Sequence, residues 1–311
     1  MKLPHLITVC LLLLLLALSS PSTAIAATGG KLRSATVPLT IFAGIAPVTA
    51  FCRELGSDRV KTEILLPPGG SPALYAPNPE QIRRLCRADL YCTLDLPFEK
   101  RLLERLQEFP RHPEIVDLQA GIARLPLPGR RPAGQPHRRP VAKPAHLDPH
   151  TWLDPRLAAR QAATITAALI RRDPAGRSFY LRRLQELEER LSTLDRELRA
   201  RLRPLQGETL LVYHPALGYF ARAYGLRQSA IEEQGKPPRG RRLARLLRQA
   251  HRLRIKAIFV EPQFDRRSAA EIASRSGCRL LTFDPLAADY PANLLRLATA
   301  IRQAAGLPEN D

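Results

Sequence analysis

Short apolar runs alternate with helical patterns in both halves of this chain, and that alternation limits the folds open to it. In the first half, the runs Thr36–Ala43, Val60–Leu66 and Ala88–Leu94 are followed by helical patterns at Pro47–Leu55, Pro79–Cys86 and Phe98–Phe109. In the second half, the runs Thr209–Tyr213, Lys256–Val260 and Arg279–Phe283 are followed by helical patterns at Ala216–Ala223, at Ser268–Ser276 and in a terminal segment that ends at Ala304. Strands that are each followed by a helix indicate a parallel sheet covered by helices. The sequence therefore predicts an α/β protein with two parallel-sheet lobes.

One long helix is predicted between the two lobes. From Ser178 to Arg203, leucines recur three or four residues apart and form one apolar stripe. At 1.5 Å per residue this helix would be about 39 Å long, the length of a whole lobe. A coiled-coil dimer is the alternative interpretation. Because fewer than four clean heptads precede Pro204, a backbone helix laid against both lobes is favoured.

The predicted organisation has four parts. Residues 1–26 form a signal peptide, residues 27–172 the N-terminal lobe, residues 173–204 the linking helix and residues 205–311 the C-terminal lobe. Within the N-terminal lobe, residues 125–145 are rich in proline, glycine and arginine. This composition is typical of a mobile loop.

The first residues carry the pattern of a secretory signal. Lys2 precedes an apolar run from Ile7 to Leu18, and the small-residue triplet ends at Ala26. The run is shorter than the roughly 20 residues that a membrane-spanning helix needs. We therefore expect cleavage after Ala26 and a soluble protein of the periplasm. A lipid anchor at Cys10 is less favoured, because the small residues that normally precede a lipidated cysteine are missing.

The chain is strongly basic, with 48 lysine and arginine residues against 29 acidic residues and a formal net charge of +19. Such a charge predicts anionic partners. Nucleic acid is excluded as the partner, because the export signal removes the protein from it and no aromatic-basic recognition motif is present. A solvated arginine-rich surface is the simplest interpretation.

Four cysteines follow the predicted signal peptide: Cys52, Cys86, Cys92 and Cys278. A disulfide is an option in an oxidising compartment. If Ala88–Cys92 is a strand, Cys86 and Cys92 lie too far apart to bridge each other. Any disulfide would then involve Cys52 or Cys278.

Three polar residues fall where α/β sheets place ligands, just beyond strands or at the start of a helix. His214 and Asp284 each follow a predicted strand, and His150 lies just before a predicted helix. Two imidazoles and a carboxylate suit a divalent cation, zinc above all, with manganese and iron as alternatives. Each residue taken alone also has an ordinary interpretation as a strand-end, turn or loop residue.

Five segments together resemble the zinc- and manganese-binding solute receptors of bacterial ABC importers. They are Leu66-Pro-Pro-Gly-Gly-Ser-Pro72, Asp148-Pro-His-Thr-Trp-Leu-Asp-Pro155, Tyr213-His-Pro-Ala-Leu-Gly-Tyr-Phe220, Glu261-Pro-Gln-Phe264 and Phe283-Asp-Pro-Leu286. The second and third are the specific ones, and the resemblance covers nearly the whole exported chain in order. It implies a metal ion bound between two α/β lobes joined by one long helix, with an ABC permease as partner and a monomeric receptor.

The resemblance also assigns ligand positions. His150, His214 and Asp284 match the family's second, third and fourth ligands, and a histidine at the third position favours Zn²⁺ over Mn²⁺ as cargo. The residue at the first position is Ala73, which has no donor atom. Water, a second oxygen of Asp284, or a histidine from the loop region, His146 or His137, are the alternatives for the fourth donor.

Two other functions compete with metal capture. A zinc hydrolase would use the same three ligands with Glu261 as general base, but no HExxH or nucleophile motif is present. A receptor whose metal site has decayed, and which now acts as an adhesion protein or carries a different ligand, is indicated only by Ala73. The sequence favours a metal carrier that is not an enzyme.

Overall fold

The computed structural model describes residues 37–127, 147–232 and 236–308. The predicted signal peptide lies outside the described residues. So does most of the predicted loop at 125–145, together with His137 and His146. No helix within the described ranges is both long enough and apolar enough to cross a membrane.

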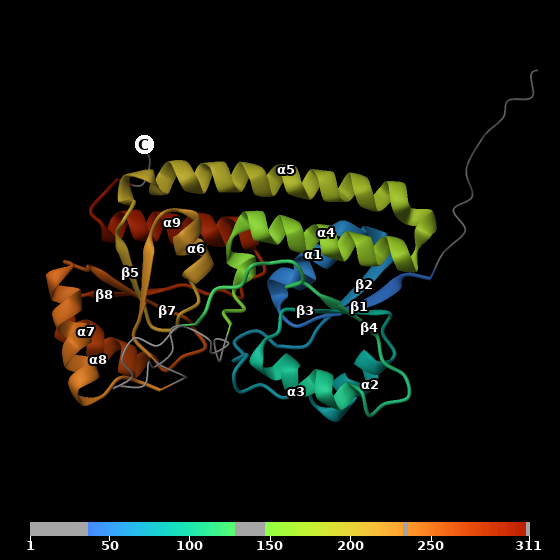
Figure 1. The fold of residues 1–311 in the computed structure, drawn as a ribbon, viewed down its shortest axis with the longest axis horizontal. Coiled ribbons are helices and arrows are strands. Elements are labelled where there is room, and N and C mark those ends of the chain that lie inside the picture. The colour runs from blue at the N-terminus through green and yellow to red at the C-terminus, as the bar shows by residue number, and fades with distance from the viewer. Residues whose placement is uncertain (1–36, 128–146, 233–235, 309–311) are drawn as a thin grey trace, which may run out of the picture. The chain divides into compact units, whose positions relative to one another are not determined.

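The first sheet has four parallel strands in the order β2-β1-β3-β4. The strands are β1 (Leu39–Ala43), β2 (Val60–Ile64), β3 (Leu90–Thr93) and β4 (Glu114–Asp117), connected by the helices α1 (Ala46–Gly56), α2 (Pro79–Cys86) and α3 (Pro97–Leu106). Figure 1 shows α1 on one face of the sheet and α2 and α3 on the other. Both faces are therefore covered, which explains why the central strands read as continuous apolar runs.

The second sheet repeats this topology in the order β6-β5-β7-β8, again with parallel strands. Its elements are β5 (Thr209–Val212), α6 (Gly218–Ala223), β6 (Arg227–Ala230), α7 (Gly240–Arg252), β7 (Ala257–Val260), α8 (Arg266–Ser276), β8 (Arg279–Thr282) and α9 (Tyr290–Ala304). In each sheet the strand order reverses beside the first strand. Ligands of open α/β sheets bind beyond the carboxyl ends of strands at such a reversal.

The predicted α/β class with two parallel sheets is confirmed, and the structure adds elements that the sequence did not indicate. The missed strands are β4 and β6, which lie at sheet edges. Strand β6 reads Arg-Gln-Ser-Ala and has no apolar alternation. An edge strand is paired and covered less than a central one, so its sequence need not be apolar. The arginine-rich helix α7 was also missed.

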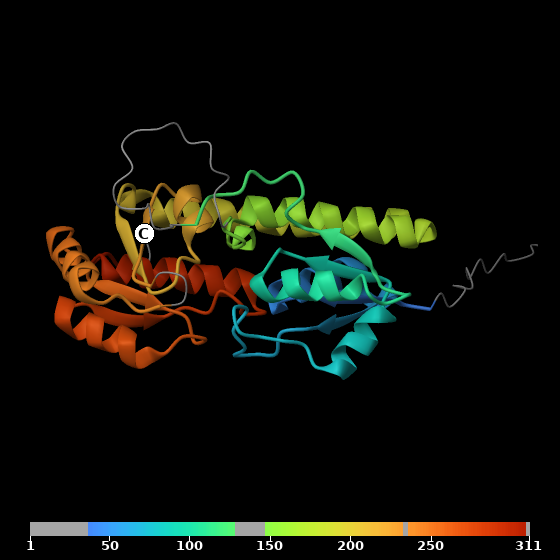
Figure 2. The ribbon, with the colours of Figure 1, turned by 60° about the horizontal axis from the view of Figure 1, so that its bottom comes forward.

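The long helix between the sheets is α5 (Arg177–Leu202), which has 26 residues and follows α4 (Pro155–Arg172). Its leucines from position 187 onward are at most 4% exposed, whereas Leu181 near its start is 43% exposed. The helix packs on α1 and α4 beside the first sheet and on α9 beside the second, as Figures 1 and 2 show. The backbone-helix interpretation is therefore confirmed.

Polar contacts fasten both ends of α5. At its start, Asp173 accepts hydrogen bonds from Arg59 at 2.5 Å and from the Tyr180 hydroxyl at 2.7 Å. At its end, buried Arg302 of α9 donates to the carbonyl of Arg201 at 2.8 Å. The helix is thus tied to the first sheet's elements at one end and to the second's at the other.

The four described cysteines are free. Two of them are neighbours, because Cys52 of α1 and Cys92 of β3 place their sulfur atoms 3.8 Å apart in the core. Cys86 and Cys92 do not pair, and the predicted involvement of Cys52 or Cys278 in any disulfide stays a prediction.

A buried carboxyl group organises the carboxyl end of β3. Glu99 is fully buried and accepts hydrogen bonds at 2.9 Å from the backbone amides of Leu94 and Leu96 and from the Thr93 hydroxyl. Burial raises the pKa of Glu99 to about 7 despite these donors. Gly44 must be glycine here, because an added β-carbon would lie 2.1 Å from the Glu99 carboxyl.

This raised pKa predicts a pH dependence of stability. Because the folded protein holds the Glu99 proton up to about pH 7 and the unfolded chain releases it near pH 4.5, stability falls as pH rises through this window. In Glu99→Gln the side chain has no proton to release, so we expect roughly 1–3 kcal/mol of that pH dependence to disappear. Urea unfolding between pH 4.5 and 8 measures it. Glu104→Gln, at an exposed position of the same helix, should keep the wild-type profile.

Candidate metal centre

The two predicted histidines meet. His150 lies just before the short helix Thr151–Leu153 that leads into α4, and His214 follows β5 of the second sheet. Their imidazole rings are 5.3 Å apart, centre to centre, with planes at 76°. The fold therefore brings the two imidazoles, which are far apart in sequence, to one place.

A buried carboxylate holds the same ring nitrogen of each histidine. Asp148 Oδ1 lies 2.7 Å from His150 Nδ1, and Glu232 Oε1 lies 2.6 Å from His214 Nδ1. Such a contact fixes the tautomer with the proton on Nδ1 and leaves Nε2 as a lone-pair donor. The pair of imidazoles therefore offers two Nε2 atoms of fixed orientation to a cation.

His214 lies in a partly apolar environment. Its ring stacks on Phe264, with centres 4.8 Å apart, and its side chain is 27% exposed. Burial lowers the pKa of His214, while the hydrogen bond to Glu232 acts in the opposite direction. The lowered pKa keeps the imidazole neutral at pH 7, which is the form that binds metal.

Asp284 follows β8, as predicted, and is held by neighbours from its own sheet. Its Oδ1 accepts hydrogen bonds from Gln263 Nε2 at 2.9 Å and from the Leu286 amide at 3.0 Å. The next residue, Pro285, accepts a hydrogen bond at 2.9 Å from the indole of buried Trp152. The loop after β8 is thereby attached to the segment that carries His150.

The described residues contain no group of three or more histidine, cysteine, aspartate or glutamate side chains arranged to hold a metal ion. The structure thus brings His150 and His214 together, whereas the Asp284 carboxylate is hydrogen-bonded to Gln263 and is not grouped with the two histidines. Ala73 is exposed in a turn that follows β2. A methyl group supplies no ligand there.

Glu261, the residue considered as a general base, follows β7 and is buried. Burial raises its pKa to about 8, and the nearby charges of Glu232 and Asp284 act in the same direction. A carboxyl group with this pKa carries its proton at pH 7. This protonation state applies to the site without a bound cation, because a dication beside Glu261 would lower its pKa.

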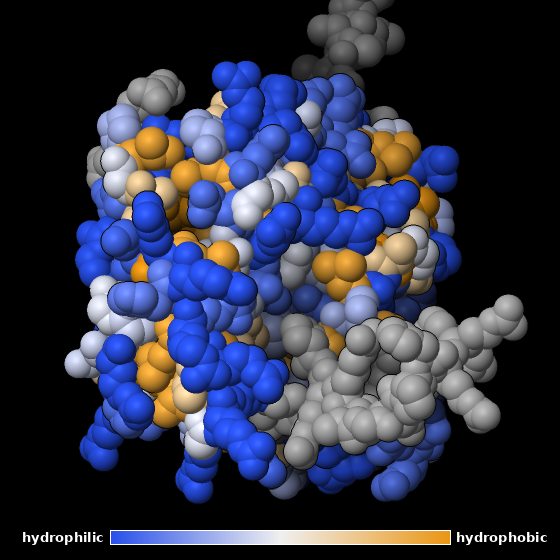
Figure 3. Space-filling view, turned by 60° about the vertical axis from the view of Figure 1, so that its left-hand side comes forward, coloured by the Kyte–Doolittle hydropathy of each residue, from blue (hydrophilic) through white to orange (hydrophobic). Residues whose placement is uncertain are grey.

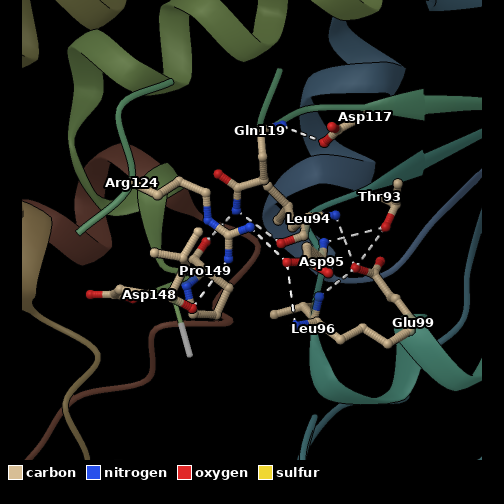
Figure 4. Close-up of polar contacts among 12 residues, drawn as sticks. Thr93, Leu94, Asp95, Leu96, Glu99, Asp117, Gln119, Arg124, Asp148 and Pro149 are labelled. Carbon is tan, nitrogen blue, oxygen red and sulfur yellow. Dashed lines mark hydrogen bonds and ion pairs between the residues drawn. The ribbon is translucent and has the colours of Figure 1, made fainter. Parts of the chain in front are cut away.

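Gln119, beyond the end of β4, fastens the loop that carries His150 to the first sheet (Figure 4). Its side-chain amide donates to the carbonyls of Leu94 and Pro149, both at 2.9 Å, and its carbonyl accepts from the Thr151 hydroxyl at 3.0 Å. Because all three side-chain bonds are buried, the backbone next to His150 has little freedom.

Arg124 makes a second connection to the same loop. Its guanidinium binds Asp95 at 2.6 Å and the carbonyl of Leu147 at 3.1 Å, so it joins the end of β3 to the residue before Asp148 (Figure 4). From the other side, the Tyr219 hydroxyl of α6 donates to the Asp148 carbonyl at 3.1 Å. The backbone that carries the Asp148 side chain is therefore held by residues of both halves.

Sequence reasoning missed the orienting roles of Asp148 and Glu232 and the supporting role of Gln119. Asp148 was available, since it stands two residues before His150 in the most specific motif. Glu232 follows the missed strand β6, and Gln119 follows the missed strand β4. No local pattern marks these two residues, because their roles depend on pairing across the sheets.

Comparisons with known proteins match this chain to one family. The family described as the periplasmic zinc-uptake complex component A matches residues 41–304. The high-affinity zinc uptake system protein ZnuA of Bacillus subtilis (strain 168) is 25% identical over 237 residues, covering 75% of this chain and 74% of that protein. The manganese ABC transporter substrate-binding lipoprotein PsaA of Streptococcus anginosus is 26% identical over 268 residues and 82% of each chain. A crystal structure of ZnuA has a TM-score of 0.78 and 33% identity, covering 86% of this chain and 99% of that chain.

The approach of α6 to Asp148 gives a test of the orienting carboxylate. A β-carbon added to Gly218 would lie 2.7 Å from Asp148 Oδ2, so Gly218→Ala must displace that carboxylate. We expect zinc affinity to fall about 10-fold or more, because the His150 ring loses its fixed orientation. Helix propensity favours alanine, so the free energy of unfolding should change by no more than about 1 kcal/mol.

The chain has one tryptophan, and the Trp152 ring lies 5.2 Å from the His150 ring. Its fluorescence during a zinc titration reports occupancy at His150 directly. An unchanged affinity in Gly218→Ala would show that Asp148 does not set the ring's orientation.

Proposed function

Because this chain belongs to the family of the periplasmic zinc-uptake complex component A, we propose that it captures one zinc ion outside the cytoplasm and delivers it to the permease of an ABC importer. Its relatives are metal-transport receptors, so zinc is cargo that is bound and released unchanged. The experiments below test the residues that would hold it.

One observation carries the assignment of the ligands. His150 and His214 come from different halves of the chain, and each presents Nε2 because a buried carboxylate holds its Nδ1. Histidines that donate their second nitrogen to a carboxylate are typical of zinc sites. Two histidines with separate structural roles would not be expected to lie with ring centres 5.3 Å apart and each with a buried carboxylate at Nδ1.

We propose Asp284 as the third ligand. The Asp284 carboxylate accepts only hydrogen bonds from Gln263 and the Leu286 amide, both neutral donors. Both hydrogen bonds go to Oδ1, which leaves Oδ2 for a zinc ion bound at the two imidazoles. A carboxylate binds a dication more strongly than it binds an amide. The Gln263 contact would hold Asp284 in place until the metal arrives.

Zinc suits these donors better than manganese does. Two imidazoles and one carboxylate match the preference of zinc for nitrogen ligands, whereas manganese prefers sites dominated by oxygen. The position of Ala73 leaves a fourth coordination place for water or for a histidine from outside the described residues. Relatives named for zinc and for manganese both match this chain, so the metal itself must be measured.

A hydrolytic role is the weaker candidate. The family is one of transport receptors, and the sequence has no HExxH or nucleophile motif. We further propose that the protein is a periplasmic monomer, released by cleavage after Ala26. The early apolar run and the small-residue triplet support that cleavage.

The first test is metal content. We expect about one zinc ion per chain in protein purified from the periplasm, and a loss of zinc affinity of more than about 100-fold in His150→Ala and in His214→Ala. Inductively coupled plasma mass spectrometry and competition with a chromogenic chelator measure both. His112→Ala removes an exposed histidine elsewhere and should bind like the wild type. Equal zinc binding by all four proteins would exclude this site.

A pair of variants separates the third ligand from its hydrogen-bond partner. Asp284→Asn removes the charge that would bind zinc, and we expect zinc affinity to fall about 10-fold to 100-fold. Gln263→Ala removes one hydrogen bond to Asp284 but keeps the carboxylate charge, so zinc affinity should stay closer to that of the wild type. A fall of equal size in both variants would mean that the loop after β8 has a structural role alone.

A further inference from the structure

The segment 236–260 concentrates the basic character of the chain. It contains nine lysine and arginine residues and no aspartate or glutamate. It includes all of α7 and the strand β7. Metal capture, as proposed above, uses none of these positive charges.

Four arginines share one side of α7. Arg241, Arg245, Arg248 and Arg252 recur at intervals of four, three and four residues, which places them on one face of a helix. All four are exposed. We call them the α7 arginine face. The opposite side of the helix, including Leu246 and Ala250, packs into the apolar core of the second sheet.

The α7 arginine face has no counterions within the described part of the chain. None of its four guanidinium groups makes a hydrogen bond or ion pair with another described residue, whereas Arg242 on the flank of α7 binds the carbonyls of Ile231 and Glu232. Helix α5 is different, because some of its arginines pair with acids of the same helix, such as Arg199 with Asp195 and Arg201 with Glu197. A row of unpaired like charges on a helix destabilises it unless an external anion neutralises the row.

We propose that the α7 arginine face docks on the surface of a bilayer that contains anionic phospholipids. Clusters of four to eight basic residues on one helix bind such surfaces, at about 1 kcal/mol per residue. Guanidinium groups also bind phosphate oxygens in bidentate fashion. The charge of this face is complementary to a surface of lipid phosphates.

The chemistry of the face favours a bilayer over an acidic protein. Protein interfaces are anchored by aromatic and apolar residues that fill pockets. Among the described residues, the α7 arginine face has no aromatic residue, and its one neighbouring large apolar side chain that is exposed is Leu253, 39% exposed between Arg252 and Arg254. Figure 3 shows the side of the protein that carries α7, where hydrophilic side chains project around small apolar areas. Binding to a lipid surface requires positive charge on the protein but does not require apolar anchors that fill a pocket.

The docking would be electrostatic and shallow. The apolar side of α7 is already committed to the core, so this helix cannot turn its leucines toward lipid as an inserting amphipathic helix does. Attraction then falls off within about 8 Å at physiological salt, and added salt should release the protein. The docking itself does not depend on the proposed function. Its consequence does, because docking would keep a metal carrier beside a membrane permease.

Vesicle co-sedimentation tests the proposal with the protein purified from the periplasm. Vesicles of phosphatidylcholine with about one third phosphatidylglycerol are compared with vesicles of phosphatidylcholine alone. We expect binding only to the anionic vesicles. At about 0.5 M salt the Debye length falls to a few ångströms, so the protein should be released. Arg245→Gln, Arg248→Gln and Arg252→Gln combined should weaken the association about 100-fold, since three charges are removed.

The matched control removes the same number of exposed arginines from α5. Arg177→Gln, Arg182→Gln and Arg196→Gln combined should leave vesicle binding within about threefold of the wild type. Equal losses in both triple variants would overturn the proposal in favour of a non-specific effect of net charge. The proposal would also be overturned if the wild-type protein did not bind anionic vesicles, even if it bound an acidic protein instead.

Zinc titration of the same proteins keeps the two hypotheses apart. The α7 triple variant should retain wild-type zinc affinity and circular dichroism, which shows that its fold is intact. A protein that binds vesicles but no zinc would refute the metal-carrier function and leave the docking surface standing.

Discussion

The apolar core along α5 holds the two sheets together. Buried leucines of this helix join side chains beneath both sheets in one continuous cluster, which includes Phe42 of β1 and Leu294 of α9. Separating the two halves would expose that cluster to water at about 25 cal/mol per Å². The sheets can therefore make only small movements that leave α5 in place, and the loops at their carboxyl ends stay near one another. Two hydrogen bonds reinforce this arrangement. The Trp152 indole donates to the carbonyl of Pro285 in the loop after β8, and the hydroxyl of Tyr290, the first residue of α9, donates to the Trp152 carbonyl.

That frame decides which atoms face a cation. The His150 ring is positioned by Asp148, and Asp148 is positioned by contacts from both sheets, including the Tyr219 hydroxyl. The His214 ring is positioned by Glu232, which follows the edge strand β6. Each imidazole thus depends on a carboxylate that contributes no metal bond of its own. Such supporting residues limit the directions in which Nε2 can point, and therefore the set of metals that the site can accept.

The charges near the histidines and those on α7 have opposite signs. The formal net charge is +19, yet the carboxylates that contact the histidines lie inside, with Asp148 and Glu232 at most 4% exposed. The arginines of α7 project outward instead. Because salt screens exposed charges beyond about 8 Å while buried charges are screened much less, a dication at the histidines responds chiefly to the nearby carboxylates. A basic surface and a cation site are therefore compatible in one molecule.

The two parallel sheets, the long helix and the two histidines that meet could be predicted from local sequence patterns. Apolar runs bounded by helical patterns and a stripe of leucines reflect burial at fixed intervals. The residues His150 and His214 could be named because they stand in specific motifs at strand and helix ends. Three features depend on tertiary packing: β4 and β6 pair at sheet edges, Glu232 and Asp148 orient the imidazoles, and Asp284 accepts a hydrogen bond from Gln263. Edge strands are covered on fewer sides, so their sequences show only a weak apolar pattern. A hydrogen bond between residues far apart in sequence leaves no periodic pattern in the sequence, because the packing of whole sheets against α5 brings its partners together.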